Sequence, residues 1–269
     1  MNCEIKDLKV NYEIKGNGKP IVILHGYNVD HRLMTGCIES ALSESYEYKR
    51  IYIDLPGMGK TESREWIINS DIMLEIIIEC INKIIPNENF LLAGESYGGY
   101  LSLGIIYKMK EMVDGLFLLC PKTKKNAPKP KHVVLKKDDE LLSKLGKEEL
   151  EVFQSMQVVQ TKETWERYNS EILSGIRISD NDFLTNLEKR GTRLSFEESI
   201  FKQKFDKPTL FLVGRQDSCV GYKGLWDIMD NYPRATFAVL DMAGHNLQIE
   251  QPDVFDSLFN EWLKRVSYF

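Results

Sequence analysis

The sequence has no long apolar run and no excess of basic residues. Its 269 residues carry 35 Lys and Arg against 40 Asp and Glu, which gives a net charge of −5. Such a chain has no basic field to attract nucleic-acid phosphates. No stretch approaches the roughly 18 consecutive apolar residues expected of a membrane-spanning helix, and charged residues at 4, 6, 7 and 9 interrupt any apolar signal segment. We therefore expect no nucleic-acid partner, no membrane association and no signal peptide.

Cysteine is also too sparse to organise the fold. The five cysteines are Cys3, Cys37, Cys80, Cys120 and Cys219. Their odd number, wide spacing and lack of a nearby histidine at zinc spacing predict neither a disulfide framework nor a metal site. No glycine-rich phosphate-binding motif follows an apolar run. We expect a protein of the reducing cytoplasm that uses no metal and no organic cofactor.

What the sequence does have is enough apolar material for one sizeable core. Hydrophobic residues make up 43% of the chain and aromatic residues 10%, which excludes intrinsic disorder. The length fits one domain with an insertion better than two full domains. We expect a single globular core with an added segment.

Short apolar runs alternate with segments of helical character. An amphipathic strand is expected over 4–14, and buried strands are expected over 21–24, 50–53, 90–93, 113–119, 209–213 and 236–240. Helices are expected over 72–85, 99–110, 222–231 and 252–265. This alternation predicts the α/β fold class, with a mostly parallel central sheet covered by helices on both faces.

The alternation stops between 122 and 205, where we expect a helical cap and no buried strand. Apolar residues recur there at helical spacing, as in the set Leu150, Phe153, Met156, Trp165, Tyr168, Ile172, Phe183 and Leu187. The predicted organisation is a core of 1–121 and 206–269 with the cap at 122–205. The segment 122–137 holds seven lysines and two prolines before the first acid, Asp138. It is interpreted as a solvated linker, with a basic rim for anions as the alternative.

The residue with the clearest chemical signal is Ser96. An apolar strand runs directly into Gly94-Glu95-Ser96-Tyr97-Gly98 and then into a helical pattern. A strand-to-helix bend of this kind needs small residues beside the nucleophile and holds its hydroxyl at the carboxyl edge of the sheet. We predict that Ser96 is a nucleophile; the alternative is a turn serine that only caps the following helix.

A serine nucleophile needs a base. The four histidines are His25, His31, His132 and His245. His245 follows the last predicted strand on a glycine-containing loop and is the predicted base. His25 reaches the same edge but precedes Gly26, which suits a loop-fixing hydrogen bond, while His31 and His132 are expected on the surface.

The base in turn needs a carboxylate to orient it. Asp217 lies just past the strand predicted over 209–213 and is the favoured acid. Asp54 is explained by a local Asx turn, and Asp241 by a turn after its strand. Glu95 neighbours the nucleophile, but we expect its side chain to point elsewhere on so tight a bend.

Five segments then resemble one family, the α/β-hydrolase superfamily, in order along nearly the whole chain outside the cap. They are HGYN at 25–28, DLPGMG at 54–59, GESYGG at 94–99, GRQD at 214–217 and AGHN at 243–246. The resemblance implies an eight-stranded, mostly parallel sheet and a helical lid between the sixth and seventh strands. It also implies a triad of Ser96, Asp217 and His245, with an oxyanion hole made by the backbone N–H groups of Tyr27 and Tyr97.

Two departures narrow the activity that the resemblance implies. Tyr27 and Asn28 stand where one branch has glycines, so a pocket for bulky tertiary-alcohol esters is not expected. A serine nucleophile also argues against the dehalogenase branch, which uses aspartate.

We predict a serine hydrolase, of carboxylesterase type, that cleaves a small carboxylic ester or related acyl compound through an acyl-enzyme. The alternatives are an aminopeptidase or a carbon–carbon bond hydrolase of the same fold, or a ligand-binding module that keeps the hydrolase shell. The presence of all three triad residues disfavours the last.

Overall fold

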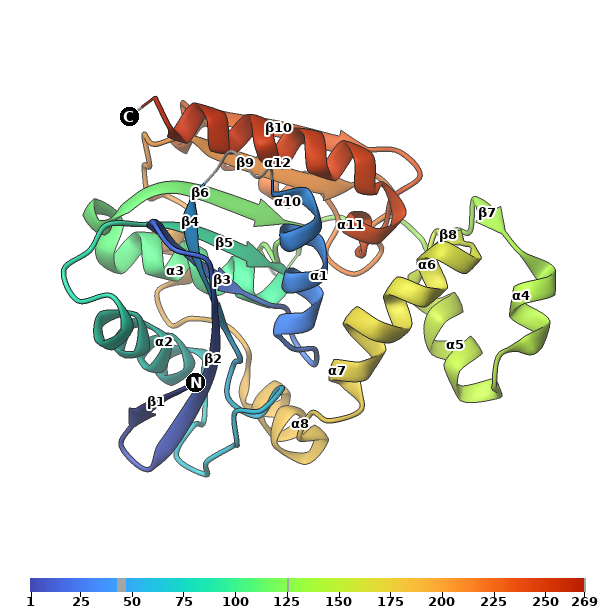
Figure 1. The fold of residues 1–269 in the computed structure, drawn as a ribbon, viewed down its shortest axis with the longest axis horizontal. Helices are drawn as coiled ribbons and strands as arrows, with labels where there is room; N and C mark the ends of the chain where they lie inside the picture. Colours follow the sequence, from blue (N-terminus) through green and yellow to red (C-terminus); the bar gives the residue numbers. More distant parts are fainter. Residues whose placement is uncertain (43–46, 125, 269) are drawn as a thin grey trace.

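The computed structural model describes residues 1–42, 47–124 and 126–268. Within these residues the main sheet has eight strands, in the order β1-β2-β4-β3-β5-β6-β9-β10 (Figure 1). The strands are β1 (Asn2–Ile5), β2 (Leu8–Lys15), β3 (Lys19–Leu24), β4 (Tyr48–Ile53), β5 (Phe90–Glu95), β6 (Val113–Leu119), β9 (Thr209–Gly214) and β10 (Ala235–Leu240). The pairs β1–β2 and β2–β4 are antiparallel, and the other pairs are parallel. The predicted mostly parallel sheet is confirmed.

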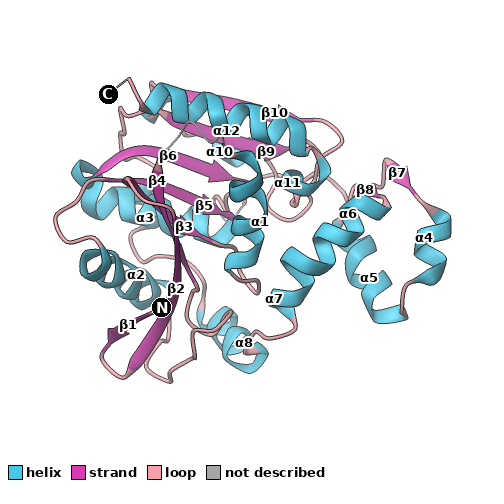
Figure 2. Ribbon diagram, viewed as in Figure 1, coloured by secondary structure: helices cyan, strands magenta, loops and turns pink. Residues whose placement is uncertain are grey.

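Helices cover both faces of this sheet (Figure 2). The helices α2 (Ser70–Ile84) and α3 (Ser96–Met109) pack in one apolar cluster, and α1 (His31–Ala41) and α12 (Pro252–Val266) pack in the other. Along β5, Phe90 and Leu92 enter the first cluster, whereas Leu91 and Ala93 enter the second. Successive strand residues point to opposite faces, so burial on both faces explains the unbroken apolar runs of the sequence.

Several elements differ from the sequence-based expectation. The strand expected over 4–14 is a hairpin of β1 and β2, whose turn contains Lys6 at a φ of 55°. A lysine rarely adopts this left-handed conformation. The turn was not predicted, because it contains no glycine or asparagine. The helix expected over 222–231 is only α10 (Lys223–Trp226) and a 3₁₀ turn at Met229–Asn231. Helix α1 was missed, although Asp30 caps it by accepting a hydrogen bond from the backbone N–H of Arg32.

The segment between β6 and β9 is mainly helical, as expected. It contains α4 (Asp139–Lys144), α5 (Lys147–Met156), α6 (Lys162–Arg167), the π-helical turn η2 (Tyr168–Leu173), α7 (Ser174–Ile176), α8 (Asn181–Arg190) and α9 (Glu197–Ile200). It also forms two short strands, β7 (Lys136–Lys137) and β8 (Val159–Gln160), and β8 is buried, which the sequence did not predict. In Figure 1 the green-to-yellow helices α4 to α7 lie beyond the arrowheads of β5 and β6. Lys125, one of the seven linker lysines, lies outside the described residues.

Neither disulfides nor spanning helices appear in the part of the chain that is described. All five cysteines are free, and four of them are buried. Each helix within the described ranges is too short or too polar to cross a bilayer.

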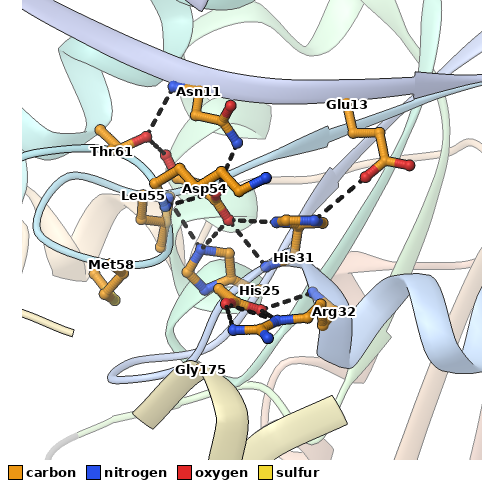
Figure 3. A network of polar contacts seen from close by, with 12 residues as sticks. Asn11, Glu13, His25, His31, Arg32, Asp54, Leu55, Met58, Thr61 and Gly175 are labelled. Carbon is orange, nitrogen blue, oxygen red and sulfur yellow. Dashed lines mark hydrogen bonds and ion pairs between the residues drawn. The ribbon is translucent and has the colours of Figure 1, made fainter. Parts of the chain in front are cut away.

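A network of polar contacts centred on Asp54 joins β2, the start of α1 and the loop after β4 (Figure 3). The Asp54 carboxylate is fully buried. It accepts hydrogen bonds from Asn11 Nδ2 at 2.8 Å, from His31 Nδ1 at 2.8 Å and from the backbone N–H of Lys60 at 3.0 Å. The expectations of a local Asx turn for Asp54 and of a surface position for His31 were therefore wrong. Two of the three partners, Asn11 and His31, come from segments that are distant in the sequence, and the His31 side chain is only 12% exposed.

His25 lies beside this network and has the loop-fixing contacts expected of it. Its Nδ1 is 2.7 Å from the carbonyl oxygen of Gly26, and its Nε2 accepts a hydrogen bond from the backbone N–H of Leu55 at 3.0 Å. Both ring nitrogens are therefore occupied by backbone groups. This arrangement leaves no ring nitrogen of His25 for a reaction at the carboxyl edge.

The charges in the network make its contribution to stability depend on pH. Burial alone would raise the pKa of Asp54, but the hydrogen bond from His31 and the nearby histidines hold that pKa well below its usual range. The same hydrogen bond raises the pKa of His31. The stabilisation from Asp54 is complete above the ordinary carboxyl pKa and is lost as the pH falls through the lowered pKa of Asp54. The stabilisation from His31 is complete below the ordinary histidine pKa and is lost as the pH rises through the raised pKa of His31. The network should contribute most between about pH 4 and 6.5.

We predict that Asp54→Asn lowers the free energy of unfolding by about 3 kcal/mol, because a neutral amide replaces a buried carboxylate that His31 needs as its partner. Asp241→Asn is the control. Asp241 is exposed and takes part in one side-chain hydrogen bond, from Gln216 Nε2, so the change should stay within about 0.5 kcal/mol. Urea unfolding followed by tryptophan fluorescence measures both, and equal effects would show that the Asp54 network contributes no special stability.

Candidate active site

Ser96 occupies the sharp junction between β5 and α3. Its φ is 50°, in the left-handed region that costs a non-glycine residue energy and is often found at functional sites. The bend is tight enough that a Cβ at Gly98 would collide with the carbonyl oxygens of Leu24 and His25. The strand-to-helix bend predicted from the sequence is therefore present, and it holds the serine at the carboxyl edge of the sheet.

His245 stands between Ser96 and Asp217. Its Nε2 is 2.9 Å from Ser96 Oγ, and its Nδ1 is 2.9 Å from Asp217 Oδ2. In the neutral imidazole these contacts are a hydrogen bond from the serine hydroxyl to Nε2 and one from Nδ1–H to the carboxylate. Asp217 follows β9 and His245 follows β10, so the structure brings together three residues that the sequence placed at one edge. Their catalytic roles stay a prediction.

Asp217 is held by its surroundings in the ionised state. Its side chain is fully buried, and its Oδ1 accepts hydrogen bonds from the backbone N–H groups of Cys219 at 2.8 Å and Val220 at 3.0 Å. Burial alone would raise the pKa of Asp217, but the charge of His245 and these hydrogen bonds keep that pKa below its usual value. A carboxylate so held can orient an imidazole and stabilise its protonated form.

The pKa of His245 is shifted in the opposite direction. Burial alone would lower its pKa, but the charge of Asp217, with further contributions from Cys219 and Glu95, raises that pKa well above the ordinary histidine value. The imidazole is therefore a stronger base than a solvated histidine. It is suited to taking a proton from Ser96.

Glu95 faces this histidine, contrary to the expectation from the sequence. Its Oε1 lies 3.3 Å from His245 Nε2, and its side chain is 2% exposed. The bend turns the chain after Glu95, so Glu95 keeps its place at the end of β5. Gly26 provides the room, since a Cβ there would collide with Glu95 Oε2. Burial raises the pKa of Glu95 to about 7.

Glu250 supports the loop that carries His245. It belongs to the short helix α11 (Leu247–Glu250) and accepts hydrogen bonds from the backbone N–H groups of Gly244 at 2.5 Å and Val158 at 2.6 Å. Burial raises its pKa to about 7. One carboxyl thus links the histidine loop to the segment next to β8. Sequence reasoning missed it, because its partners are backbone groups, one of them far away in the chain.

A cavity of about 270 Å³ lies beside Ser96, Glu95 and His245. Six of its lining residues come from the segment 122–205, namely Val152, Ser155, Met156, Tyr168, Ile172 and Ile176. Phe153 and Trp165 are not among the lining residues. Their rings pack against each other at 5.2 Å, and Phe153 lies 5.3 Å from the ring of Tyr168. They hold the helices of this segment together.

Tyr27 and Tyr97 use their hydroxyl groups in structural contacts. The Tyr27 hydroxyl donates to the carbonyl oxygen of Leu184 at 2.6 Å, and the Tyr97 hydroxyl lies 2.7 Å from Ser70 Oγ. Tyr97 follows Ser96 in the first turn of α3, which has no side-chain cap, so its N–H group is one of the unpaired amides of a helix start. The use of the Tyr27 and Tyr97 backbone N–H groups as an oxyanion hole stays a prediction.

One group of potential metal ligands occurs among the described residues, at this same site. Ligand atoms of Cys120, Asp217 and His245 lie within 4.8 Å of one another. Sequence spacing did not reveal this group, because its members follow three different strands. It fits a metal ion poorly, since Asp217 and His245 already bind each other and burial raises the pKa of the Cys120 thiol well above its ordinary value.

Known proteins share this architecture. The model of the alpha/beta hydrolase fold family matches residues 19–252. A pimeloyl-[acyl-carrier protein] methyl ester esterase of Legionella pneumophila (strain Paris) is 24% identical over 261 residues, which are 96% of this chain and 100% of that protein. An alpha/beta superfamily hydrolase from Oenococcus oeni PSU-1 has 31% identity and a TM-score of 0.89 over 96% of each chain. A thermophilic esterase from Thermogutta terrifontis has the same fold, with 20% identity and a TM-score of 0.71 over 96% of this chain and 94% of that one. The chain therefore belongs to the α/β hydrolase fold family and is a hydrolase.

Proposed function

We propose that the protein is a serine hydrolase that cleaves a small carboxylic ester, or a related acyl compound, through an acyl-enzyme. The observation that carries this proposal is the position of His245, with one ring nitrogen 2.9 Å from Ser96 Oγ and the other 2.9 Å from Asp217. A nucleophile, a base and an orienting acid in this arrangement are what acyl transfer requires.

The reaction proceeds in two halves. Ser96 Oγ attacks the ester carbonyl while His245 Nε2 takes the hydroxyl proton, and Asp217 stabilises the imidazolium. The backbone N–H groups of Tyr27 and Tyr97 bind the oxyanion, and one such donor is worth about 3 to 4 kcal/mol. His245 then gives the proton to the leaving alcohol. In the second half, water attacks the acyl carbon while His245 takes a proton from it. The bond to Ser96 Oγ then breaks, the acid leaves, and His245 returns the proton to Ser96 Oγ.

The segment 122–205 acts as a lid on this site, between core parts 1–121 and 206–269. Its residues form much of the wall of the cavity beside Ser96, which supports a role in substrate choice and in excluding water. At about 270 Å³ this cavity lies just below the usual range of ligand pockets, about 300 to 1,000 Å³. It suits a small acyl group.

The alternatives are less well supported. A ligand-binding module has no need for a serine, an imidazole and a carboxylate in hydrogen-bond contact. An aminopeptidase would need a carboxylate in the segment 122–205 to bind the substrate ammonium, and none of the six residues of that segment that line the cavity is acidic. Glu197 is paired with Arg193, and Glu163 is exposed. The similarity to a methyl ester esterase also favours ester hydrolysis, so methyl esters belong in the first substrate panel.

Ser96→Ala should abolish both ester turnover and covalent labelling by a fluorophosphonate, because the mutant lacks the attacking oxygen. The free energy of unfolding should change by less than about 1 kcal/mol, since no core packing is lost. Undiminished labelling of the mutant would show that another residue is the nucleophile.

Asp217→Asn should reduce kcat by about 10⁴-fold, because the amide would favour the wrong tautomer of His245. Asp241→Asn, the matched change at the other aspartate near this edge, should leave kcat within about twofold, as Asp241 is exposed and hydrogen-bonds Gln216. Steady-state kinetics on one activated ester measures both. A larger loss in the Asp241 variant would reassign the orienting acid.

The pH dependence should report His245, which must be neutral to accept the serine proton. The specificity constant kcat/KM should therefore rise with pH, and the midpoint of this rise should lie above the ordinary histidine pKa. Glu95→Gln should move the midpoint to lower pH, because it removes a negative charge that raises the pKa of His245. Glu163→Gln, on the exposed surface of the lid, should leave it in place. An unchanged midpoint in the Glu95 variant would contradict the coupling.

A further inference from the structure

Glu250 is a buried residue whose carboxyl group joins the lid to the loop that carries His245. Its Oε1 accepts hydrogen bonds from the backbone N–H groups of Val158 at 2.6 Å and Val159 at 3.2 Å, and its Oε2 accepts one from Gly244 at 2.5 Å. The residue is only 6% exposed. Val158 and Val159 belong to the lid, and Gly244 immediately precedes His245. One side chain therefore bridges the lid and the base.

These contacts require a group that accepts hydrogen bonds at both of its ends. In the described part of the chain, the partners of the Glu250 carboxyl group are backbone N–H groups, with no cation among them. Burying a carboxylate without a cation is costly. A glutamine could accept at one end only, because its other end is a donor. A side chain that only filled space would not need a carboxyl group here.

The residues that Glu250 binds in the lid are tied to the rest of the lid. The carbonyl oxygen of Val158 accepts a hydrogen bond from the backbone N–H of Leu135 at 2.9 Å, and that of Val159 accepts one from the Thr164 hydroxyl at 2.8 Å. Met156, which lines the cavity, lies two residues before Val158. A shift of the lid would therefore move the N–H groups that Glu250 binds.

The lid also packs closely against the histidine loop and against helix α11. A Cβ at Gly244 would lie 2.9 Å from Val158 Cγ2, so the loop and the lid meet without a gap. Arg167 of the lid donates from Nη1 to the carbonyl oxygen of Gln248 in α11 at 2.9 Å. The same short helix carries Glu250. The lid, α11 and the histidine loop are therefore one connected unit.

We propose that Glu250 is a positioning residue that couples the lid to the base, so that His245 is aligned with Ser96 only when the lid is seated. Glu250 does not line the cavity. It acts through Gly244, whose N–H it binds, on the adjacent His245. A misplacement of about 1 Å at a reacting group can cost about 100-fold in rate. The inference rests on the proposed role of His245 and adds a residue through which the lid controls it.

The kinetic test is Glu250→Gln, which should lower kcat for an activated ester by about tenfold or more, because the histidine loop loses a fixed acceptor. KM should change by less than about twofold, since Glu250 does not line the cavity. A raised KM with an unchanged kcat would overturn the proposal, because Glu250 would then hold only the lid.

Glu197→Gln is the matched control. Glu197 also ties the lid to the core, by accepting a hydrogen bond from the Tyr100 hydroxyl at 3.1 Å, but its partners Tyr100 and Arg193 lie outside the histidine loop. Its kcat should stay within about twofold of the native value. An equal fall of kcat in both variants would overturn the proposal, because any loosening of the lid would then have the same effect.

Two changes in the lid separate coupling from local support of the loop. Val158→Pro removes an N–H that donates to Glu250, and the preceding Gln157 has the extended backbone that a residue before proline adopts, with φ −88° and ψ 131°. Thr164→Val is milder and removes the hydrogen bond to the Val159 carbonyl. Val158→Pro should lower kcat by about tenfold and Thr164→Val by about threefold. Native kcat in both overturns the coupling, and Thr164→Val decides alone if the proline variant does not fold.

A spectroscopic measurement separates this proposal from the proposed reaction. Proton–nitrogen correlation spectra of protein labelled with ¹⁵N-histidine, recorded at alkaline pH, report which ring nitrogen of His245 carries the proton, and His245→Ala assigns the signal. The native protein should show the Nδ1–H form that Asp217 stabilises. Glu250→Gln should show a mixture of both tautomers, whereas Glu197→Gln should not.

The two proposals can then fail separately. If the native protein hydrolyses no ester but Glu250→Gln still changes the tautomer of His245, the proposed function fails and the positioning role stands. An unchanged tautomer in Glu250→Gln overturns the positioning role whether or not esters are hydrolysed.

Discussion

The two hydrogen bonds of His245 join loops that follow three different strands, β5, β9 and β10. These loops meet because parallel strands end at one edge of the sheet, where ligands of open α/β sheets bind. The contacts at 2.9 Å on each side then depend on two local supports. The bend at Ser96 requires Gly98, and the histidine loop is held by Glu250 through the N–H of Gly244.

Three buried carboxyl groups near His245 have different pKa values because their surroundings differ. Asp217 accepts two backbone hydrogen bonds and one from the imidazole, which keeps its pKa low despite burial. Glu95 and Glu250 are dominated by desolvation, which raises the pKa of each to about 7. Environments that separate the pKa values of nearby groups are characteristic of catalytic sites. Here the carboxyl group with the lowered pKa is the one that contacts Nδ1, while the pKa of Glu95, beside Nε2, is raised to about 7.

The sequence predicted the parallel strands, the helical segment and the meeting of Ser96, Asp217 and His245, because these depend on local patterns and on the rule that parallel strands end at one edge. It failed where contacts link distant segments through backbone groups or charge. The Asp54 network draws on β2 and α1, and Glu250 binds Val158 across 92 residues. The side-chain direction of Glu95 depends on the space left by Gly26.

The proposed reaction requires a covalent acyl intermediate on Ser96. The most direct measurement is intact-protein mass spectrometry after rapid acid quench during hydrolysis of an activated ester, followed by peptide mapping. We expect a transient mass increase equal to one acyl group, located on the peptide that contains Ser96. An adduct on Cys120 or Cys219, or turnover under single-turnover conditions with no adduct at any time, would contradict it.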